Sequence, residues 1–299
     1  MMSRRQWLGW LAGAAAPAAL AATAGYGCFV EPHWLAVREH TVRLTRLPAA
    51  LDGFRVAHIS DIHYHERVVP VSYLERAVAL VNAQGADLVA VTGDLVSNEV
   101  ARYGQAAARL LSNLRAPQGV FVVLGNHDYA VYGSSHDMAA RRARGAAAGE
   151  LMARALRAGG LTLLRNQAHV IERNGARLTV VGLDDLWAGR FDPAKAFAQC
   201  GTDGLRLVLQ HNPDGVDQLP PLTESLVLAG HTHGGQVRLP FMGRLRLSVE
   251  NEAYAYGMIP LSWTQQMYVT SGVGYNRRVR LGVRPEVAVL TLRRAKEAT

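Results

Sequence analysis

The sequence predicts an α/β protein in which two β-sheets pack against each other with helices outside. Short apolar runs typical of buried strands alternate with segments of helical spacing, and both halves of the chain contain such strand–helix units. The 299 residues, of which 49% are hydrophobic, suffice for one sizeable core. No internal repeat and no low-complexity tract follows the N-terminal segment. We therefore expect one main domain, residues 40–294, after an N-terminal segment, residues 1–30.

The first half of this domain should supply four strands, each followed by a helix or a loop. The strands are predicted at residues 41–45, 54–60, 88–91 and 120–124. The helices are predicted at residues 73–84, 102–114 and 150–158, with an insertion over residues 132–149 before the last. Residues 41–45 alternate between polar and apolar side chains, which is typical of an edge strand.

The second half should be richer in strands. Residues 169–172 and 178–181 flank Arg173-Asn174-Gly175, which predicts a β-hairpin. Further strands are predicted at residues 205–209, 225–229, 267–270 and 287–290, with a long Gly- and Pro-punctuated loop over residues 237–263.

The N-terminal segment resembles an export signal. Ser3-Arg4-Arg5 precedes an aromatic residue and a leucine, as in twin-arginine signals, and residues 7–30 carry no charge. That uncharged stretch is long enough to span a bilayer if it is not cleaved. We expect an inner-membrane-associated or periplasmic protein with the main domain outside the cytoplasm; the alternative is an anchor with this domain facing the cytoplasm.

Charge and cysteine content exclude some classes of function. Thirty of the 32 basic residues are arginine, and no basic stripe with interleaved aromatics accompanies the net charge of +8, so we expect no nucleic-acid partner. An anionic substrate or an anionic membrane surface fits the charge. The two cysteines, Cys28 and Cys200, are too few for a thiolate metal site. We expect a monomer.

Metal-ligating side chains stand at the ends of successive predicted strands. They are Asp61, His63, Asp94, Asn126, His127, His211, His231 and His233. Because sites in open α/β sheets form outside the carboxyl ends of strands, we expect these residues to meet. They are too many for one ion and suit two divalent ions of the hard or borderline class, Mn, Fe, Zn or Mg. Two ions with a bridging hydroxide can drive an in-line displacement at phosphorus, and no Gly-x-Ser-x-Gly nucleophile motif competes with this interpretation.

The order of these motifs resembles the calcineurin-like metallophosphoesterase superfamily. Asp-x-His, Gly-Asp, Gly-Asn-His-Asp, a lone His after a strand, and Gly-His-x-His occur in that order between about Arg55 and Leu292. The run from Gly230 to Pro240 is similar to a bacterial membrane-associated or exported branch that includes UDP-2,3-diacylglucosamine pyrophosphatases. The resemblance implies a four-layer αββα sandwich of two mixed sheets between helices.

The resemblance also implies a role for each residue. Asp61, His63 and His233 would hold the first ion. Asn126, His211 and His231 would hold the second, and Asp94 would bridge the two. His127 would contact the phosphoryl oxygen or protonate the leaving group, oriented by Asp128. Manganese is the favoured metal.

These observations together predict a di-metal phosphodiesterase or pyrophosphatase acting on an anionic, lipid-linked phosphoester such as UDP-2,3-diacylglucosamine. The alternatives are a phosphomonoesterase acting on nucleotides or proteins and a catalytically silent metal-binding scaffold. The scaffold is disfavoured because none of the expected ligands is missing from the sequence.

Overall fold

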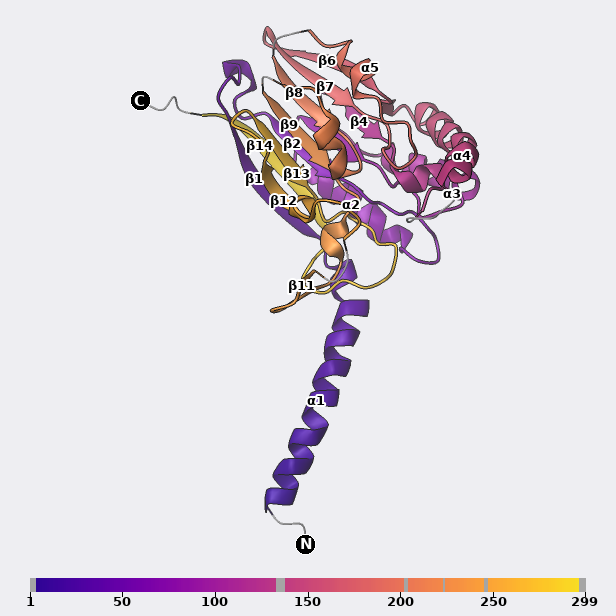
Figure 1. Cartoon of the computed structure of the whole chain (residues 1–299), viewed down its shortest axis with the longest axis vertical. Coiled ribbons are helices and arrows are strands. Elements are labelled where there is room, and N and C mark those ends of the chain that lie inside the picture. The colour runs from indigo at the N-terminus through magenta and orange to yellow at the C-terminus, as the bar shows by residue number, and fades with distance from the viewer. Residues whose placement is uncertain (1–3, 133–137, 202–203, 223, 245–246, 296–299) are drawn as a thin grey trace.

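Two six-stranded mixed sheets face each other and form the body of the protein (Figure 1). The computed structural model describes residues 4–132, 138–201, 204–222, 224–244 and 247–295. The first sheet has the order β1 (Ala36–Leu44), β14 (Glu286–Arg294), β2 (Arg55–Ile59), β3 (Leu88–Thr92), β4 (Val120–Val123) and β5 (Thr162–Leu163). The second has the order β12 (Gly257–Pro260), β13 (Gln265–Val269), β9 (Ser225–Ala229), β8 (Leu205–Leu209), β7 (Ala176–Gly182) and β6 (Gln167–Arg173). The predicted α/β class with two mixed sheets is confirmed.

The core lies between the two sheets and against their outer faces. Within β9, Leu226 and Leu228 pack into the cluster between the sheets, whereas Val227 and Ala229 pack into the outer cluster. Successive side chains of a strand point to opposite faces, so a strand buried on both faces must be apolar throughout. This explains why the central strands are continuous apolar runs in the sequence.

Helices cover the outer faces. Helices α2 (Val71–Ala83), α3 (Val100–Leu111) and α4 (Met138–Ala158) pack on the first sheet. The second sheet is covered more thinly, by the five-residue helix α5 (Pro193–Phe197) and a 3₁₀ segment, Pro213–Gln218. The four layers that the sequence predicts are present, although the fourth contains little helix.

The strand directions gather the polar ends at one edge of the sandwich. Strands β2, β3 and β4 run parallel in the first sheet, as do β7, β8 and β9 in the second. The loops that follow them are joined by hydrogen bonds, for example from Asp61 N to Gly93 O at 3.0 Å and from Gly230 N to His211 O at 3.0 Å. The His211 imidazole crosses between the sheets and meets Thr92 O at 2.7 Å. This edge is where the metal ligands were expected.

The N-terminal segment forms helix α1 (Arg4–Phe29), which projects from one end of the sandwich (Figure 1). Within the described part of the chain, no helix is both long enough and apolar enough to cross a bilayer.

Two expectations differ from the structure, and a third is confirmed. Helix α4 begins at Met138, so much of the expected insertion is helical; residues 133–137 lie outside the described chain. The long loop over residues 237–263 contains the short hairpin β10 (Arg238–Leu239) and β11 (Gly243–Arg244), and also β12. The predicted hairpin of β6 and β7 is confirmed, and Asn174 and Gly175 at its turn both have positive φ, as a type I′ turn requires.

Candidate metal centre

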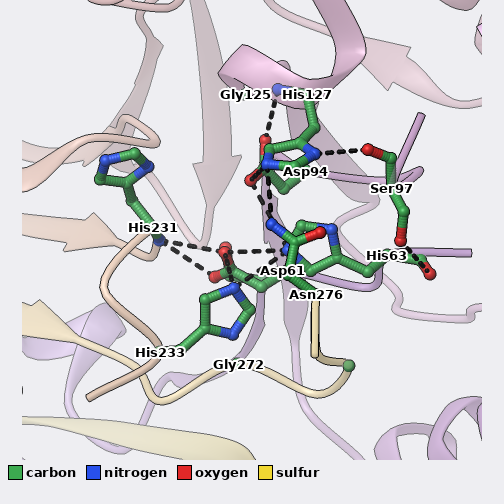
Figure 2. A network of polar contacts seen from close by, with 12 residues as sticks. Asp61, His63, Asp94, Ser97, Gly125, His127, His231, His233, Gly272 and Asn276 are labelled. Atoms are coloured by element: carbon green, nitrogen blue, oxygen red, sulfur yellow. Dashed lines mark hydrogen bonds and ion pairs between the residues drawn. The ribbon is translucent and has the colours of Figure 1, made fainter. Parts of the chain in front are cut away.

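The expected ligands converge on one buried site (Figure 2). The ligand atoms of Asp61, His63 and His233 lie within 4.8 Å of one another, and so do those of Asp94, His211 and His231. A third group, His63, Asp94 and His127, links the two. All of these side chains except that of His127 are buried. Asp61 and His233, which are 233 − 61 = 172 positions apart in the sequence, therefore belong to one cluster.

Five of these residues have left-handed backbone. Positive φ angles occur at Asp61, His63, Asp94, His231 and His233, with values from 48° to 71°. Such a conformation costs a non-glycine residue about 1–3 kcal/mol and is concentrated at functional sites. The turns that follow the strands hold it in place; His63 N, for example, donates to Asp94 O at 2.9 Å, and His231 N donates to Asp61 Oδ2 at 3.0 Å. The fold thus maintains strained turns in order to direct these side chains inward.

Asp94 stands between the two groups. Its Oδ2 atom lies 3.2 Å from His211 Nε2, 3.7 Å from His63 Nε2 and 3.9 Å from His127 Nε2. In the first group, His63 Nε2 and His233 Nε2 are 3.0 Å apart, and His233 Nε2 is 3.4 Å from Asp61 Oδ1. Ligands about 2.1 Å from a shared ion are separated by about 3.0 Å in octahedral geometry and about 3.4 Å in tetrahedral geometry. The separations of 3.0 and 3.4 Å in the first group and of 3.2 Å between Asp94 and His211 match those of residues that share an ion.

Several buried atoms in the cluster have no hydrogen-bond partner. Asn126 donates from Nδ2 to Val131 O at 2.6 Å, which aligns the amide and leaves its buried Oδ1 without a partner. His231 Nε2 is also buried and without a partner. Unsatisfied buried polar atoms are rare in folded proteins and call for a specific explanation. Ligation of a cation satisfies the Asn126 oxygen, whereas His231 faces the cluster with its other ring nitrogen, Nδ1, which lies 3.2 Å from His211 Nε2. The donor set of imidazole, carboxylate and amide oxygen suits Mn, Fe or Zn.

The protonation states of the cluster suit cation binding. Burial lowers the pKa of His63 and of His231 to about 3, which leaves both imidazoles neutral. Burial acts to raise the pKa of Asp94, but His211 and His127 outweigh it and hold this pKa well below its usual value. Burial acts to lower the pKa of His211, but the Asp94 carboxylate outweighs it and raises this pKa to about 10. Neutral His63 and His231 and anionic Asp94 can therefore bind a cation without first losing a proton, whereas His211 releases a proton when it binds one.

His127 lies at the open side of the cluster. Its Nδ1 atom is 2.5 Å from Ser97 O, which can only accept, so Nδ1 carries the hydrogen and Nε2 faces the site. The sequence analysis assigned this orienting role to Asp128. Instead, both oxygens of the Asp128 carboxylate accept backbone N–H groups, from Gly125 and from Leu95, each at 2.9 Å. Asp128 thus joins two of the loops that follow strands. The ring of His127 is oriented by its hydrogen bond to Ser97 O and not by Asp128.

Three residues near the cluster were missed by the sequence analysis. Asn276 Nδ2 lies 3.0 Å from His127 Nε2, the Trp187 ring packs edge-on against His231 at 4.5 Å, and the buried Asp185 Oδ2 has no hydrogen-bond partner. Asp185 and Trp187 follow β7, which ends at the same edge as β8 and β9. The strand-end rule identifies both if it is also applied to the second strand of the hairpin. Asn276, an exposed loop residue, gives no comparable signal in the sequence.

Comparisons with known proteins agree with this geometry. The Calcineurin-like phosphoesterase family model matches residues 54–235. An uncharacterized metallophosphoesterase of Bacillus subtilis, YkuE, is 32% identical over 297 residues, covering 98% of both chains. The phosphodiesterase YaeI of Escherichia coli is 34% identical over 294 residues, covering 98% of this chain and all of the relative. The UDP-2,3-diacylglucosamine pyrophosphatase LpxG of Chlamydia trachomatis is 29% identical, covering 87% of this chain and 90% of the relative.

The family match covers the strands that carry the seven expected metal ligands and His127, and the similarity to YkuE and YaeI extends over nearly the whole chain. The chain belongs to the calcineurin-like metallophosphoesterase family and is a hydrolase of phosphoester bonds.

Proposed function

We propose that the protein is a two-metal phosphodiesterase or pyrophosphatase acting on an anionic, lipid-linked substrate of the UDP-2,3-diacylglucosamine type. One observation carries the two-metal part of this proposal. Two buried groups of ligands, Asp61/His63/His233 and Asp94/His211/His231, meet at the Asp94 carboxylate. A single ion cannot use so many ligands, whereas two ions sharing Asp94 can.

In this proposal every ligand except the shared Asp94 serves one ion. Asp61, His63 and His233 hold the first, and Asn126, His211 and His231 hold the second. Two divalent ions supply charge neutralisation at the phosphoryl group and a nucleophile derived from water at neutral pH. Manganese is the favoured metal. It accepts the mixture of imidazole nitrogen and carboxylate oxygen found here.

His127 then acts on the substrate. Its Nε2 atom is directed toward the cluster because Nδ1 donates to Ser97 O. From this position it can hydrogen-bond a phosphoryl oxygen or, when protonated, deliver a proton to the leaving group. Asn276 reaches the same Nε2 atom and holds the ring in place from the opposite side. The cluster needs no serine or cysteine nucleophile.

The choice of substrate rests on the relatives. YaeI is named a phosphodiesterase, and LpxG is named for a pyrophosphate bond in a lipid-linked sugar nucleotide. Both names describe a phosphorus atom with two ester or anhydride substituents, so we place a diester or pyrophosphate ahead of a monoester. A monomer associated with a membrane through residues 1–30 stays a prediction.

The first experiment tests the two-metal site. Chelator-treated protein reloaded with Mn²⁺ should hydrolyse the diester bis-p-nitrophenyl phosphate. It should hydrolyse the monoester p-nitrophenyl phosphate far more slowly than the diester. Asn126→Ala and His231→Ala should each abolish turnover, whereas the matched histidine control His169→Ala, on β6 away from the cluster, should not. Wild-type turnover in either ligand variant would contradict the assignment of the metal ligands. If the protein hydrolyses the monoester faster than the diester, the proposed function becomes that of a phosphomonoesterase.

The second experiment addresses the natural substrate. The reloaded enzyme is incubated with a bacterial lipid extract and with UDP-2,3-diacylglucosamine, and the products are separated by mass spectrometry. Cleavage of the pyrophosphate with release of UMP supports the proposal. Turnover of bis-p-nitrophenyl phosphate without any lipid product would retain the chemistry and reject the lipid substrate.

A further inference from the structure

An exposed apolar tip ends the hairpin that follows the ligand His233 in the chain. Strands β10 and β11 pair Arg238 with Arg244 and Leu239 with Gly243, which leaves Phe241 and Met242 at the turn. Phe241 is fully exposed and Met242 is 71% exposed. Two adjacent large apolar side chains in water, at the end of a short hairpin, contact nothing in the described chain that would explain them.

Arginines surround this tip. Arg238 on the hairpin is exposed, as are Arg277 and Arg278 on the neighbouring loop. The hairpin and the loop are joined by hydrogen bonds from Arg238 N to Leu281 O at 2.8 Å and from Leu281 N to Gln236 O at 2.9 Å. None of these three arginines forms an ion pair with a carboxylate of the described residues. We call these five residues, Arg238, Phe241, Met242, Arg277 and Arg278, the hairpin surface.

The same loop holds the base of α1. Arg280 N donates to Gly27 O at 2.8 Å, and Arg278 Nε donates to Cys28 O at 3.1 Å. The Arg278 guanidinium stacks on the Phe29 ring at 4.8 Å, and Phe29 is itself 64% exposed. Figure 1 shows α1, which has no charged residue after Arg5, leaving the sandwich at the end where β11 lies. Uncharged and apolar chain is therefore concentrated at this one end.

The hairpin surface is coupled to the metal cluster on two sides. The hairpin begins five residues after the ligand His233, and Arg244 Nε donates back to Gly234 O at 3.1 Å. On the other side, Arg277 follows Asn276, whose amide lies 3.0 Å from His127 Nε2. Whatever binds the hairpin surface thus sits beside the opening of the site.

We propose that the hairpin surface docks on an anionic lipid bilayer, with Phe241 and Met242 inserted among the lipids and the arginines at the level of the phosphates. Charge complementarity favours lipid. Unpaired arginines beside exposed apolar side chains match a layer that is anionic outside and apolar beneath. A stable protein partner requires an interface of about 1,200 Å² or more, which two exposed side chains do not supply. Docking directs the cluster toward amphiphiles within the layer; this last step rests on the proposed function.

The full chain, loaded with Mn²⁺, is tested by cosedimentation with vesicles. Vesicles of phosphatidylcholine alone are compared with vesicles that also contain phosphatidylglycerol. Wild type should bind the anionic vesicles more strongly, and binding should weaken as salt is added. The double variant Phe241→Ser/Met242→Ser should lose roughly tenfold in vesicle affinity, because it removes the inserted apolar area. The double variant Arg277→Glu/Arg278→Glu should lose at least about tenfold in affinity for the anionic vesicles, with no change in its affinity for phosphatidylcholine vesicles.

Two controls make the outcome decisive. Trp263→Ser removes another fully exposed aromatic, which precedes the start of β13 and so lies at the end of the sandwich away from the cluster. This variant should bind vesicles like wild type. All variants should hydrolyse soluble bis-p-nitrophenyl phosphate at the wild-type rate, so failure of docking is distinguishable from failure of the catalytic proposal. The docking proposal is overturned by undiminished vesicle binding in Phe241→Ser/Met242→Ser. It is equally overturned if the wild-type protein does not bind anionic vesicles and instead self-associates through the hairpin.

Discussion

The substitution Gly125→Ala tests whether the position of Asp94 controls the metal centre. Gly125 has extended backbone, with φ −110° and ψ 176°, so alanine introduces no backbone strain at this position. An added Cβ would, however, meet the Asp94 carboxylate, lie 2.5 Å from Asp94 N and lie 2.8 Å from His211 Cδ2. Ordinary contacts begin at 3.4 Å, so the Asp94 backbone must retreat by at least 3.4 − 2.5 = 0.9 Å.

A displacement of this size is large on the scale of catalysis. A misplacement of about 1 Å costs on the order of a hundredfold in rate, which corresponds to about 2.7 kcal/mol of transition-state stabilisation. Overpacking should also lower the free energy of unfolding by about 1–3 kcal/mol. Because Asp94 faces both groups of ligands, we expect the variant to bind less metal in total rather than to lose one ion only.

The assay measures kcat/KM for bis-p-nitrophenyl phosphate, metal per chain by mass spectrometry, and the melting temperature. The matched control is Gly201→Ala, where an added Cβ meets nothing within 4 Å. We expect this control to behave like wild type in all three measurements. If Gly125→Ala keeps wild-type metal content and turnover, the bridging position of Asp94 is the wrong explanation for the close packing of these loops.

Three further predictions concern stability and the loops around the cluster. His58 is fully buried against Thr92, and burial lowers its pKa to about 3. In the unfolded chain this pKa is about 6.5. The neutral imidazole therefore contributes its full share of stability above pH 6.5, and this contribution is lost as the pH falls toward 3. Urea unfolding of the metal-free protein measures the free energy of unfolding at about pH 7.5 and at about pH 5. The decrease between these two pH values should be about 2 kcal/mol smaller in His58→Gln than in wild type, and equal decreases would contradict the buried neutral imidazole. Leu228→Ala, between the two sheets, should cost about 2–5 kcal/mol in the free energy of unfolding, and a cost below 1 kcal/mol would mean that this face of β9 is not packed as described. Asp128→Asn places an N–H donor against the backbone N–H groups of Gly125 and Leu95, so it should lower both the melting temperature and the metal content. A loss of turnover with both of these unchanged would instead support the catalytic role expected from the sequence.

The ends of the strands were predictable because strand geometry limits where polar residues can lie. A strand apolar on both faces, such as β3 or β9, leaves its first polar residues at its end, and parallel neighbours bring those ends to one edge. Asp94 and His231 are found there for that reason. The same logic would have identified Asp185 after β7, but the hairpin interpretation of β6 and β7 directed attention to the turn between them.

The turns themselves could not be predicted in the same way. Left-handed backbone at Asp61 or His63 is disfavoured by the residue alone. It exists because the backbone N–H groups of both residues donate hydrogen bonds to carbonyl oxygens of the loop that follows β3. Those bonds join segments more than 30 residues apart, which local sequence patterns do not encode. The start of α4 was missed for a related reason, since its alanine- and arginine-rich first turns lack the apolar period that marks a buried helix face.

The contrast between Asp128 and Ser97 shows where residue type stops being informative. A carboxylate next to a histidine suggests an orienting pair, and that expectation is reasonable because carboxylates often orient imidazoles. Any residue, however, supplies a backbone carbonyl, so the contact of Ser97 O with His127 Nδ1 leaves no trace in the sequence. Replacing the Ser97 side chain by alanine removes only its hydrogen bond to His63 O and keeps that carbonyl. The orientation of His127 therefore depends on the path of the chain after β3, and it should tolerate substitution at residue 97 better than a shift in that loop.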